Sequence, residues 1–485
     1  MLWTRFSAVV DRQPDAAALD ADRQAFTYAQ LRGQARHLAA RLRQSGFKAG
    51  DVAGIFIPNG PAFVCSVLAV ICEGGICLPL NTKYKERELV KYLVDAKARV
   101  VLTDAGGGQQ LARLGREFPA HRTPVLEVNL DGEPSVSHRP EPVPGDSPML
   151  LQYSTGSTGE SKLVLRTQNH LQAEFEHYTK AVGLSPADRI LGVVPLFHAH
   201  GFGNCLMGAL LSGAELVLLD NFNPRAVVQI LLKKQVTVFP GVPFMFKMMS
   251  NLKIPEKPSD FAHLRLCFSA GAPLEEGTSE QFEKIYGQPV RQLYGTTETG
   301  SISINLNPDR ASLAASVGAP MHGVEVAILD DEGRRLPAGA LGELAVRSPA
   351  MTACYLHQPE ITARFFREGW FLPGDLAVLD EKFGICLRGR KTIFINVSGN
   401  KVDPAEVERH LLTHPAVADC AVVGKQAAAG CFVKAFIVSR SPIEKEQLIG
   451  HCQGAMAEFK VPKAVEFVSE IPRSPLGKIL RKYLE

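Results

Sequence analysis

The stretch LQYSTGSTGESKLVLR, residues 151–166, decides the fold of this chain. An apolar strand leads into a loop made almost wholly of Ser, Thr and Gly, and a second apolar run, residues 163–165, follows it. Gly156 and Gly159 permit turns that other residues resist, and Lys162 adds positive charge at the end of the loop. A loop with so little side-chain bulk lets backbone N–H groups and hydroxyls close around an oxyanion. The stretch therefore predicts a phosphate site between two strands.

Three other interpretations fit the same loop less well. Runs of Gly and Ser are often flexible linkers, but the apolar strands on both sides argue against a linker here. The spacing of Gly156, Gly159 and Lys162 does not fit the G-x4-G-K-[ST] pattern of a P-loop. The loop also lacks the G-x-S-x-G elbow of a hydrolase. Taken alone, it supports phosphate binding.

Length, charge and cysteine usage narrow the class of protein. A chain of 485 residues exceeds what one hydrophobic core supports, so two or more domains are expected. The net charge of +3, from 53 basic and 50 acidic residues, is nearly balanced, and no basic tract stands out that would bind nucleic acid. The ten cysteines are scattered without a C-x-x-C pair, which favours reduced thiols in a cytosol over disulfides or zinc.

No segment has the pattern of a leader peptide or a membrane span. Residues 1–15 lack an apolar run long enough for a signal peptide. The most membrane-like run, residues 63–80, is interrupted by Glu73-Gly74-Gly75 and is predicted to be a buried helix followed by a strand. We expect a soluble cytoplasmic protein.

Alternating helix and strand patterns predict an α/β fold in the first part of the chain. Residues 1–145 form one such block, with a helical period over 27–44, and a second block follows the loop. Short alternating strands around an Asp-Glu-Gly turn predict a small antiparallel section over 317–348. The predicted strands of the two blocks are 52–57, 99–103, 189–194, 215–219, 236–239 and 264–268, with a helix over 201–211.

A domain boundary is predicted near residues 387–392. We expect a large N-terminal domain over 1–388, built from two layered α/β sheets and the antiparallel section, and a small α+β domain over 393–485. The elements predicted for the small domain are a helix that starts at Asp403 and Pro404, and strands over 417–423 and 432–438.

A second group of chemistry-bearing residues reads Tyr294-Gly295-Thr296-Thr297-Glu298. Bound phosphates need a hard cation, and Mg²⁺ takes oxygen ligands, typically one or two carboxylates together with substrate phosphates. Glu298 is the candidate carboxylate. An ordinary turn with an exposed glutamate explains the same residues.

A third candidate is Asp375, which ends the run GWFLPGD, residues 369–375. A carboxylate accepts hydrogen bonds from both hydroxyls of a ribose. The competing interpretation is an exposed aspartate on a loop.

The run YSTGSTGESK, residues 153–162, resembles the phosphate-binding loop of the adenylate-forming superfamily, which comprises acyl-CoA synthetases, nonribosomal adenylation domains and luciferases. Ser161 stands where that family usually has Pro, and Leu163 where it usually has Gly. The resemblance implies that the loop holds the phosphates of ATP, with Thr158 also serving catalysis. Its implied ATP contacts are Ser154, Thr155, Gly156, Ser157, Thr158, Gly159 and Lys162.

Further motifs occur in the order of the superfamily. YGTTE matches its Y-G-x-T-E motif without departure, which implies that Tyr294 stacks on adenine and that Glu298 binds Mg²⁺. Asp375 resembles the ribose-binding carboxylate, although Pro373 replaces the usual Thr, and Arg390 resembles a second ribose or phosphate contact. The remaining implied nucleotide contacts are Gly271, Ala272, Pro273, Gly295, Thr296 and Thr297.

The C-terminal part carries three further likenesses. PRSPLGKILR, residues 472–481, resembles the catalytic-lysine motif, in which Lys478 would bridge the substrate carboxylate and the α-phosphate. Thr392 stands at the hinge position, usually Asp or Lys, and the resemblance implies a hinge over 389–392 beside a mobile C-terminal domain. Gly399 resembles the glycine that lets the pantetheine arm of CoA pass.

PLFHAHG, residues 195–201, resembles the acid pocket of acyl-CoA synthetases, with His198 near the carboxylate or the gate. A structural histidine is the alternative, and we interpret His200 as structural. Amino-acid-activating relatives carry an Asp in this segment, and its absence here argues for a plain carboxylic acid. The other residues expected to line this apolar pocket are Phe239, Gly241, Val242 and Gly295.

The resemblance implies an acid:CoA ligase that works in two steps. ATP, Mg²⁺ and a small aliphatic or aryl carboxylic acid would give acyl-AMP and pyrophosphate, and CoA would then displace AMP. A carrier protein or an amine is the alternative acceptor. A non-catalytic relative that binds nucleotide or acyl groups is a more distant alternative, which the retained motif residues disfavour.

Overall fold

The computed structural model divides into two compact units, which are described separately. The first contains Met1–Ser154, Ser161–Val326 and Val346–Phe371, and the second contains Thr155–Glu160, Ala327–Ala345 and Leu372–Glu485. The residues whose structure is described are 2–21, 24–84, 86–109, 111, 123–130, 142–155, 161–275, 277–391, 395–397, 400–427, 430–453, 455–474, 477 and 479–484.

The larger sheet of the first unit runs in the order β15-β14-β13-β12-β11-β9-β10-β1-β2 across the described residues. Its central strands, from β13 to β1, are parallel to their neighbours, whereas β2, β14 and β15 pair antiparallel at the two edges. The bounds are Ala17–Ala21 (β1), Gln24–Thr27 (β2), Arg189–Gly192 (β9), Glu215–Leu218 (β10), Val238–Gly241 (β11), Leu266–Ser269 (β12), Val290–Thr296 (β13), Gly300–Ile304 (β14) and Ala319–Pro320 (β15).

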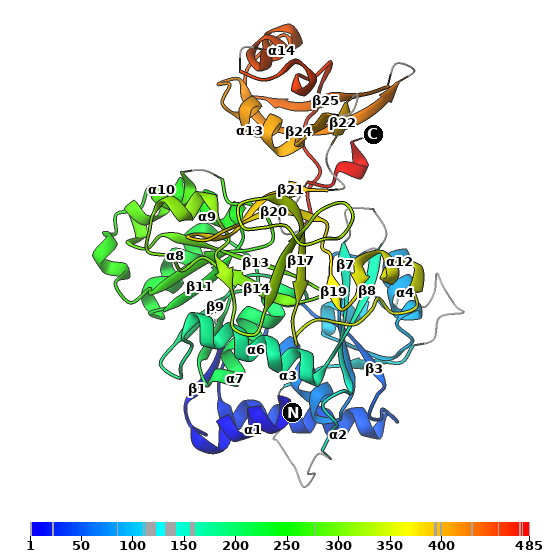
Figure 1. Ribbon diagram of the computed structural model, residues 1–485. Helices are drawn as coiled ribbons and strands as arrows, with labels where there is room; N and C mark the ends of the chain where they lie inside the picture. The colour runs from blue at the N-terminus through cyan, green and yellow to red at the C-terminus, as the bar shows by residue number, and fades with distance from the viewer. Residues whose placement is uncertain are drawn as a thin grey trace. The chain divides into compact units, whose positions relative to one another are not determined.

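A second sheet in this unit has the order β6-β5-β3-β4-β7-β8. Figure 1 labels three of its strands, β3, β7 and β8. The pairings from β6 through β7 are parallel, as in β3 with β4 and with β5. Two largely parallel sheets confirm the prediction of two α/β layers. The bounds are Val52–Phe56 (β3), Ile76–Pro79 (β4), Ala98–Thr103 (β5), Val125–Glu127 (β6), Pro148–Thr155 (β7) and Ser161–Thr167 (β8).

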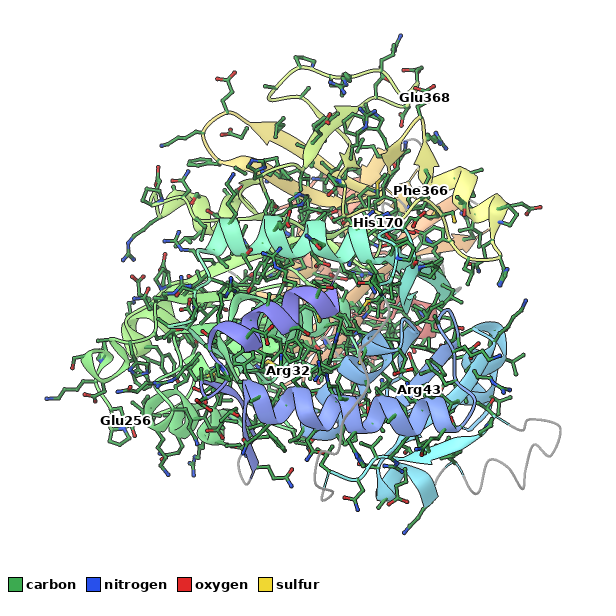
Figure 2. The ribbon with its side chains drawn as sticks, turned by 90° about the horizontal axis from the view of Figure 1, so that it is seen from below. Arg32, Arg43, His170, Glu256, Phe366 and Glu368 are labelled. Atoms are coloured by element: carbon green, nitrogen blue, oxygen red, sulfur yellow. The ribbon has the colours of Figure 1, made fainter. Side chains whose placement is uncertain are left out.

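Several helices of the first unit begin at a residue whose side chain caps the helix. The Thr27 hydroxyl accepts a hydrogen bond from the Gln30 N–H, and the Gln30 side chain bonds back to the Thr27 N–H, so the helix predicted over 27–44 is confirmed. Figure 2 shows this helix lying beside the N-terminal helix α1. The bounds are Leu2–Arg12 (α1), Tyr28–Gln44 (α2), Pro61–Cys72 (α3), Glu86–Asp95 (α4), Gln168–Val182 (α6), Gly208–Ser212 (α7), Pro224–Lys233 (α8), Pro243–Ser250 (α9), Thr278–Tyr286 (α10), Ala311–Ala315 (α11) and Pro359–Phe365 (α12).

Two predictions for apolar segments can be compared with these helices. The membrane-like run over 63–80 is helix α3, a turn at Glu73-Gly74-Gly75 and strand β4, as predicted. The helix predicted over 201–211 is present but begins as a π-helical segment, Gly201–Met207, and continues as α7. None of the helices in the described part of the chain is both long and apolar enough to cross a membrane.

The described part of the second unit is built mainly from antiparallel strand pairs, with one parallel pair, and from buried hydrophobic clusters. β17 pairs with β20, and β20 with β21, both antiparallel, which confirms antiparallel structure at the end of the segment predicted over 317–348. Buried residues of α13, β24 and β25 pack into one hydrophobic cluster. The bounds are Glu325–Leu329 (β16), Leu341–Arg347 (β17), Asp375–Asp380 (β20), Gly384–Arg390 (β21), Ile395–Val397 (β22), Asn400–Val402 (β23), Pro404–Leu412 (α13), Val417–Ala427 (β24), Gly430–Ser439 (β25), Lys445–Gln453 (α14) and Ala464–Phe467 (β26).

The start of helix α13 follows the predicted cap. The Asp403 carboxylate accepts a hydrogen bond from the Ala405 N–H at 2.9 Å, and Pro404 occupies the first helical position. The helix and both strands predicted for this part of the chain are confirmed. The domain bounds and the hinge over 389–392 stay predictions.

Asp188 ties together the starts of three adjacent parallel strands. It lies before β9, and its Oδ1 accepts hydrogen bonds from Thr237 Oγ1, which precedes β11, and from Arg265 Nε, which precedes β12, both at 2.7 Å. Arg265 Nη2 bonds the other carboxylate oxygen at 3.0 Å. Burial alone would raise the pKa of Asp188, but the hydrogen bonds from Arg265 and Thr237 outweigh it and lower the pKa. The opposite ends of these strands carry candidate site residues.

We expect Asp188→Ala to lower the free energy of unfolding by about 2–3 kcal/mol, because Arg265 and Thr237 lose the charged acceptor that they share. The Arg265 side chain is partly exposed, so the loss should be smaller than for a fully buried pair. Urea unfolding at pH 7.5 measures the change. Glu275→Ala, which removes the exposed pair with Lys247, is the matched control and should change stability little. Equal effects of the two substitutions would contradict this role of Asp188.

Candidate active site

The predicted phosphate loop joins two buried strands, as its apolar flanks indicated. β7 leads into it through Met149, Leu150 and Leu151, all buried, and β8 leads out of it. Ser154 is half-buried at the end of β7, and the backbone of Thr155 continues that strand. Gly156, Ser157, Thr158 and Gly159 lie outside the described residues, so their phosphate contacts stay predictions.

Lys162 lies on β8 with only 4% of its surface exposed. Its ammonium sits 3.3 Å from the ring centroid of Phe365 and 5.1 Å from that of Tyr355. Aromatic faces attract a cation through their negative quadrupole, and the attraction is larger where water is excluded. The predicted phosphate-binding cation is therefore held by two aromatic rings that lie outside the sequence motifs.

The Y-G-T-T-E segment forms the hairpin between β13 and β14. Tyr294 pairs with Ser303 across it, and Gly295 lies so close to the Gly300 carbonyl that a Cβ would come within 2.5 Å. The Thr296 hydroxyl accepts the Thr299 N–H at 3.2 Å and so shapes the turn. The hairpin therefore has no room for a side chain at Gly295.

Glu298 is buried in this turn, with 5% of its surface exposed. Its Oε1 accepts a hydrogen bond from the Tyr355 hydroxyl at 2.8 Å. The alternative of an ordinary turn with an exposed glutamate is wrong. A buried carboxylate with one oxygen engaged by a phenol suits Mg²⁺, which takes one or two carboxylates and completes its shell with water and phosphate oxygens.

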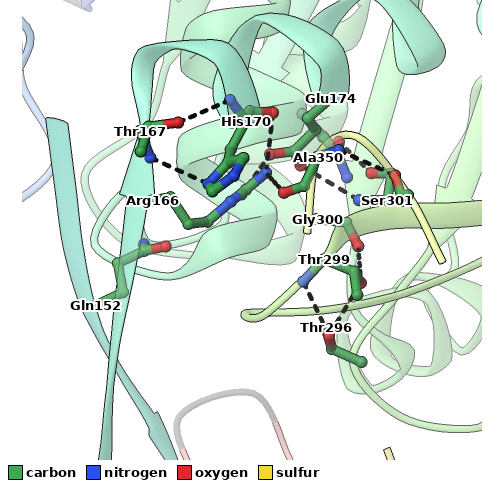
Figure 3. A network of polar contacts seen from close by, with 12 residues as sticks. Gln152, Arg166, Thr167, His170, Glu174, Thr296, Thr299, Gly300, Ser301 and Ala350 are labelled. Carbon is green, nitrogen blue, oxygen red and sulfur yellow. Dashed lines mark hydrogen bonds and ion pairs between the residues drawn. The ribbon is translucent and has the colours of Figure 1, made fainter. Parts of the chain in front are cut away.

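A buried ion pair lies next to the same hairpin (Figure 3). Arg166, at the end of β8, is 2% exposed and donates to Glu174 on α6 at 2.6 Å. Arg166 also donates to the Ala350 carbonyl at 3.1 Å. The other carboxylate oxygen of Glu174 accepts the Ser301 N–H of β14 at 3.3 Å. One ion pair thus links the strand after the phosphate loop to the strand after Glu298.

Glycine makes the close approach of the Glu174 carboxylate possible. A Cβ on Gly300 would lie 2.3 Å from that carboxylate carbon, and a Cβ on Gly203 would lie 2.7 Å from one of its oxygens. Gly300 also has a φ of +68°, which disfavours other residues. These contacts explain why glycine is needed at positions 203 and 300, which the sequence motif did not indicate.

The network continues to the predicted acid pocket. Ser301 Oγ donates to Asn204 Oδ1, and Asn204 Nδ2 donates to His200 Nδ1, each at 2.9 Å. His200 Nε2 then donates to the Gly241 carbonyl at 3.1 Å, so the neutral ring carries its proton on Nε2. Both nitrogens of His200 are engaged by protein groups, which supports its interpretation as structural.

His198 differs from His200 because its Nε2 is enclosed and has no hydrogen-bond partner among the described residues. Its ring lies 4.4 Å from that of Phe197. Burial lowers the pKa of His198 and of His200 to about 4 each, so both are neutral at physiological pH. A neutral imidazole with an unused nitrogen is suited to bind a polar group of a ligand.

The parallel strands bring other predicted residues to one edge of the larger sheet. Because β9, β11, β12 and β13 run in the same direction, the segments after them meet at their carboxyl ends, where ligands of α/β sheets bind. The Ala270 N–H donates to the Gly241 carbonyl at 3.1 Å between two of these segments. The predicted residues on this edge are His198, Gly241, Val242, Gly271, Ala272, Pro273, Tyr294, Gly295, Thr296 and Thr297.

Phe239, the remaining pocket residue of the prediction, is fully buried within β11. Its ring packs 4.9 Å from that of Phe246, and a Cβ on Gly241 would meet the same Phe246 ring at 2.7 Å. Phe246 therefore supports this part of the sheet edge, and contact of Phe239 with an acid stays a prediction.

The second unit holds the two predicted ribose contacts as a pair. Asp375 on β20 and Arg390 on β21 stand directly opposite each other, and Arg390 Nε donates to Asp375 Oδ1 at 2.7 Å. Asp375 is 6% exposed, so the alternative of an exposed loop aspartate is wrong. The next residue, Lys391, forms ion pairs with Asp331 and Glu343.

Three further predicted residues, Thr392, Gly399 and Lys478, lie outside the described residues, and their roles stay predictions. Conversely, the motifs did not include Arg166, Glu174 or Tyr355. Arg166 and Glu174 carry a weak signal in the sequence, because one is a charged residue at the end of an apolar strand and the other lies within the next helix. Nothing in the sequence indicates that they contact Ser301 or the hairpin.

Comparison with known proteins identifies the architecture. The family described as AMP-binding enzyme matches residues 6–356, and the AMP-binding enzyme C-terminal domain matches residues 406–478. A long-chain-fatty-acid–CoA ligase of Escherichia coli O6:H1 is 30% identical over 99% of this chain and 94% of its own. A feruloyl-CoA synthase of an Amycolatopsis species is 32% identical over 96% and 95%. The crystal structure of ATP-bound MatB from Rhodopseudomonas palustris aligns with a TM-score of 0.91, at 26% identity, over 100% of this chain and 98% of that one.

We expect Glu174→Ala to lower the free energy of unfolding by about 3–5 kcal/mol, because it leaves the Arg166 charge buried and unpaired. The double variant Arg166→Met/Glu174→Leu should be more stable than Glu174→Ala, since no charge is then left uncompensated. Urea unfolding of wild type and both variants tests this. A double variant that is less stable than Glu174→Ala would contradict an ion pair of this kind.

We also expect stability to fall as the pH falls from about 6.5 to about 4. In this window the unfolded chain protonates His198 and His200, which the folded protein keeps neutral, so unfolding takes up protons. Each of these histidines lowers the free energy of unfolding by up to about 3 kcal/mol at the acid end of the window. Above about pH 6.5 these histidines are neutral in both states and no stability is lost, whereas below about pH 4 they are protonated in both states and the loss no longer grows. Urea unfolding across this range should show a shallower slope for His198→Phe than for wild type. Identical slopes would contradict a neutral buried His198.

Proposed function

The chain belongs to the AMP-binding enzyme family, and from this premise we propose that it is an AMP-forming acid–thiol ligase. A carboxylic acid attacks the α-phosphate of ATP to form acyl-AMP and release pyrophosphate. The thiol of CoA then attacks the acyl carbon and AMP leaves. The observation that carries the proposal is the convergence of Lys162 and Glu298, far apart in sequence, on the same buried tyrosine.

The chemistry explains why these residue types are needed. A carboxylate is a poor electrophile with a poor leaving group, and adenylation supplies a good one. Lys162 and the loop at 154–159 would bind the β- and γ-phosphates, which leave as pyrophosphate. Glu298 fits a Mg²⁺ ligand, and that ion when bound neutralises phosphate charge. Lys478, from the sequence motif, would stabilise the charge that develops at the α-phosphate.

The nucleoside of ATP requires contacts of a different kind. We assign its ribose to Asp375 and Arg390, whose 2.7 Å pairing holds the carboxylate in a single orientation. Tyr294 offers a π-face for adenine, and the turn over 271–273 forms the wall beside it. Gly271 adopts a φ of +89°, as such a turn requires.

We assign the acid to the carboxyl edge of β9, β11 and β12, where His198 offers the unused Nε2. The absence of an aspartate over 195–201 favours a plain acid over an amino acid. The two relatives differ in kind, one named for long-chain fatty acids and the other for an aryl acid, feruloyl. The ten cysteines are free thiols, and we propose a cytoplasmic location.

The function predicts pyrophosphate release that requires both ATP and an acid. Purified full-length protein should release pyrophosphate with members of a panel of aliphatic and aryl acids. With the best acid, CoA should discharge the acyl-AMP to a thioester. Holo-carrier protein and amines are the comparison acceptors. If acyl-AMP is discharged faster to either of them than to CoA, that acceptor and not CoA is the partner. If none of the acids gives pyrophosphate release, the proposal is wrong.

Lys478→Ala should separate the two half-reactions. We expect it to lower the rate of adenylation by at least about 100-fold, since a donor placed on developing charge contributes roughly 3–4 kcal/mol. Conversion of supplied acyl-AMP and CoA to thioester should remain close to the wild-type rate. Equal loss in both half-reactions would argue against a lysine that acts in the first step alone.

A further inference from the structure

Tyr355 contacts both residues on which binding of Mg²⁺ and ATP depends, although it lies in none of the sequence motifs. It is 2% exposed, and its hydroxyl donates to Glu298 Oε1 at 2.8 Å. The same ring lies 5.1 Å from the ammonium of Lys162, which Phe365 covers at 3.3 Å. A single side chain thus adjoins the carboxylate and the cation at the same time.

The backbone around Tyr355 is attached to the strand that follows the phosphate loop. Tyr355 and Val164 form an antiparallel bridge, and the Leu356 N–H donates to the Leu163 carbonyl at 2.8 Å. The position of the tyrosine is therefore set by the same strand that carries Lys162.

The segment is attached on its other side to the glutamate turn. The Thr352 N–H donates to the Glu298 carbonyl at 2.8 Å, and the Thr352 hydroxyl donates to the Leu165 carbonyl of β8 at 2.6 Å. Residues 352–356 thus bridge β8 and the Glu298 turn through main-chain bonds, independently of the phenol.

Packing restricts the tyrosine ring to one orientation. Phe365 and Phe366 meet it edge-on, at centroid distances of 5.9 and 5.4 Å, and Val164 and Phe371 complete the buried cluster. A ring fixed in this way can hold a carboxylate in place at no further cost in side-chain entropy.

The hydrogen bond has a consequence for metal binding. Because the phenol donates to Oε1 of Glu298, it fixes the orientation of the carboxylate, and with it the direction in which the remaining lone pairs of the two oxygens face a cation. Mg²⁺ demands near-ideal octahedral geometry, so the orientation of a carboxylate ligand affects its affinity, and partners that orient ligands typically alter affinity 10- to 100-fold.

We propose that Tyr355 is a positioning residue that orients Glu298 for Mg²⁺ and holds Lys162 for the phosphates of ATP. The proposal rests on the proposed function, because it requires that these two residues serve ATP and Mg²⁺. A side chain that only fills the core would need the ring and not the hydroxyl.

Tyr355→Phe separates these roles, because it keeps the ring and removes the hydroxyl. Titration calorimetry of ATP into the full-length protein at a series of MgCl₂ concentrations, without acid, measures the effect. We expect the Mg²⁺ concentration for half-maximal ATP binding to rise about tenfold, since a hydrogen bond to a charged group is lost. Affinity for ATP at saturating Mg²⁺ should stay within about twofold of wild type, because the ring that adjoins Lys162 remains.

Two other variants make the result decisive. Tyr286→Phe removes another buried hydroxyl, which donates to the Met249 carbonyl at 3.3 Å, and should leave the Mg²⁺ midpoint unchanged. Glu298→Gln should raise the midpoint at least as much as Tyr355→Phe. An unchanged midpoint in Tyr355→Phe beside a raised one in Glu298→Gln overturns the role of Tyr355 alone, as does an equal shift in Tyr286→Phe. No shift in Glu298→Gln, or no Mg²⁺-dependent ATP binding by wild type, overturns the assigned roles of the site as well.

Discussion

The buried ion pair of Arg166 and Glu174 is the constraint on which the candidate site depends. Its charges are removed from water, so each needs its partner, and main-chain groups at Ser301, His170 and Ala350 add further hydrogen bonds. These groups belong to segments far apart in the chain. The pair therefore holds the strand after the phosphate loop, the strand after Glu298 and the segment before Tyr355 in one arrangement.

Glycine and neutral histidine complete this arrangement. The Glu174 carboxylate fits only because Gly300 has no side chain, and His200 joins the network only as the neutral tautomer that accepts from Asn204. Because hydrogen bonds run from Ser301 through Asn204 and His200 to the Gly241 carbonyl, the acid-pocket edge and the glutamate turn form one polar network. Tyr355 connects the turn at Glu298 to Lys162. The groups assigned to metal, phosphate and acid are thus held by neighbours that do not themselves react.

Local patterns predicted most elements because they depend on near neighbours. The helix capped by Thr27 and the helix that starts at Asp403 follow from caps within three residues. Buried parallel strands such as β3 are short apolar runs between turns. Helical periodicity does not predict the π-helical start at Gly201, where the glycine lies close to the carbonyl of Pro195 in the turn just before the helix. The burial of Glu298 and Asp375 was equally invisible, since a carboxylate in a turn has the same sequence context whether exposed or enclosed.

By itself the sequence determined the class of fold, the order of the motifs and the residue types that ATP-dependent acid activation needs. These features depend on periodicity, on turn chemistry and on short fixed spacings, which are properties of neighbouring residues. Only the tertiary structure decided that Glu174 meets Arg166 and Ser301, that His200 is fully engaged while His198 is not, and that Tyr355 joins Lys162 to Glu298. The physical reason is that these contacts join segments far apart in the chain, whose proximity follows from sheet order and burial and not from any local pattern.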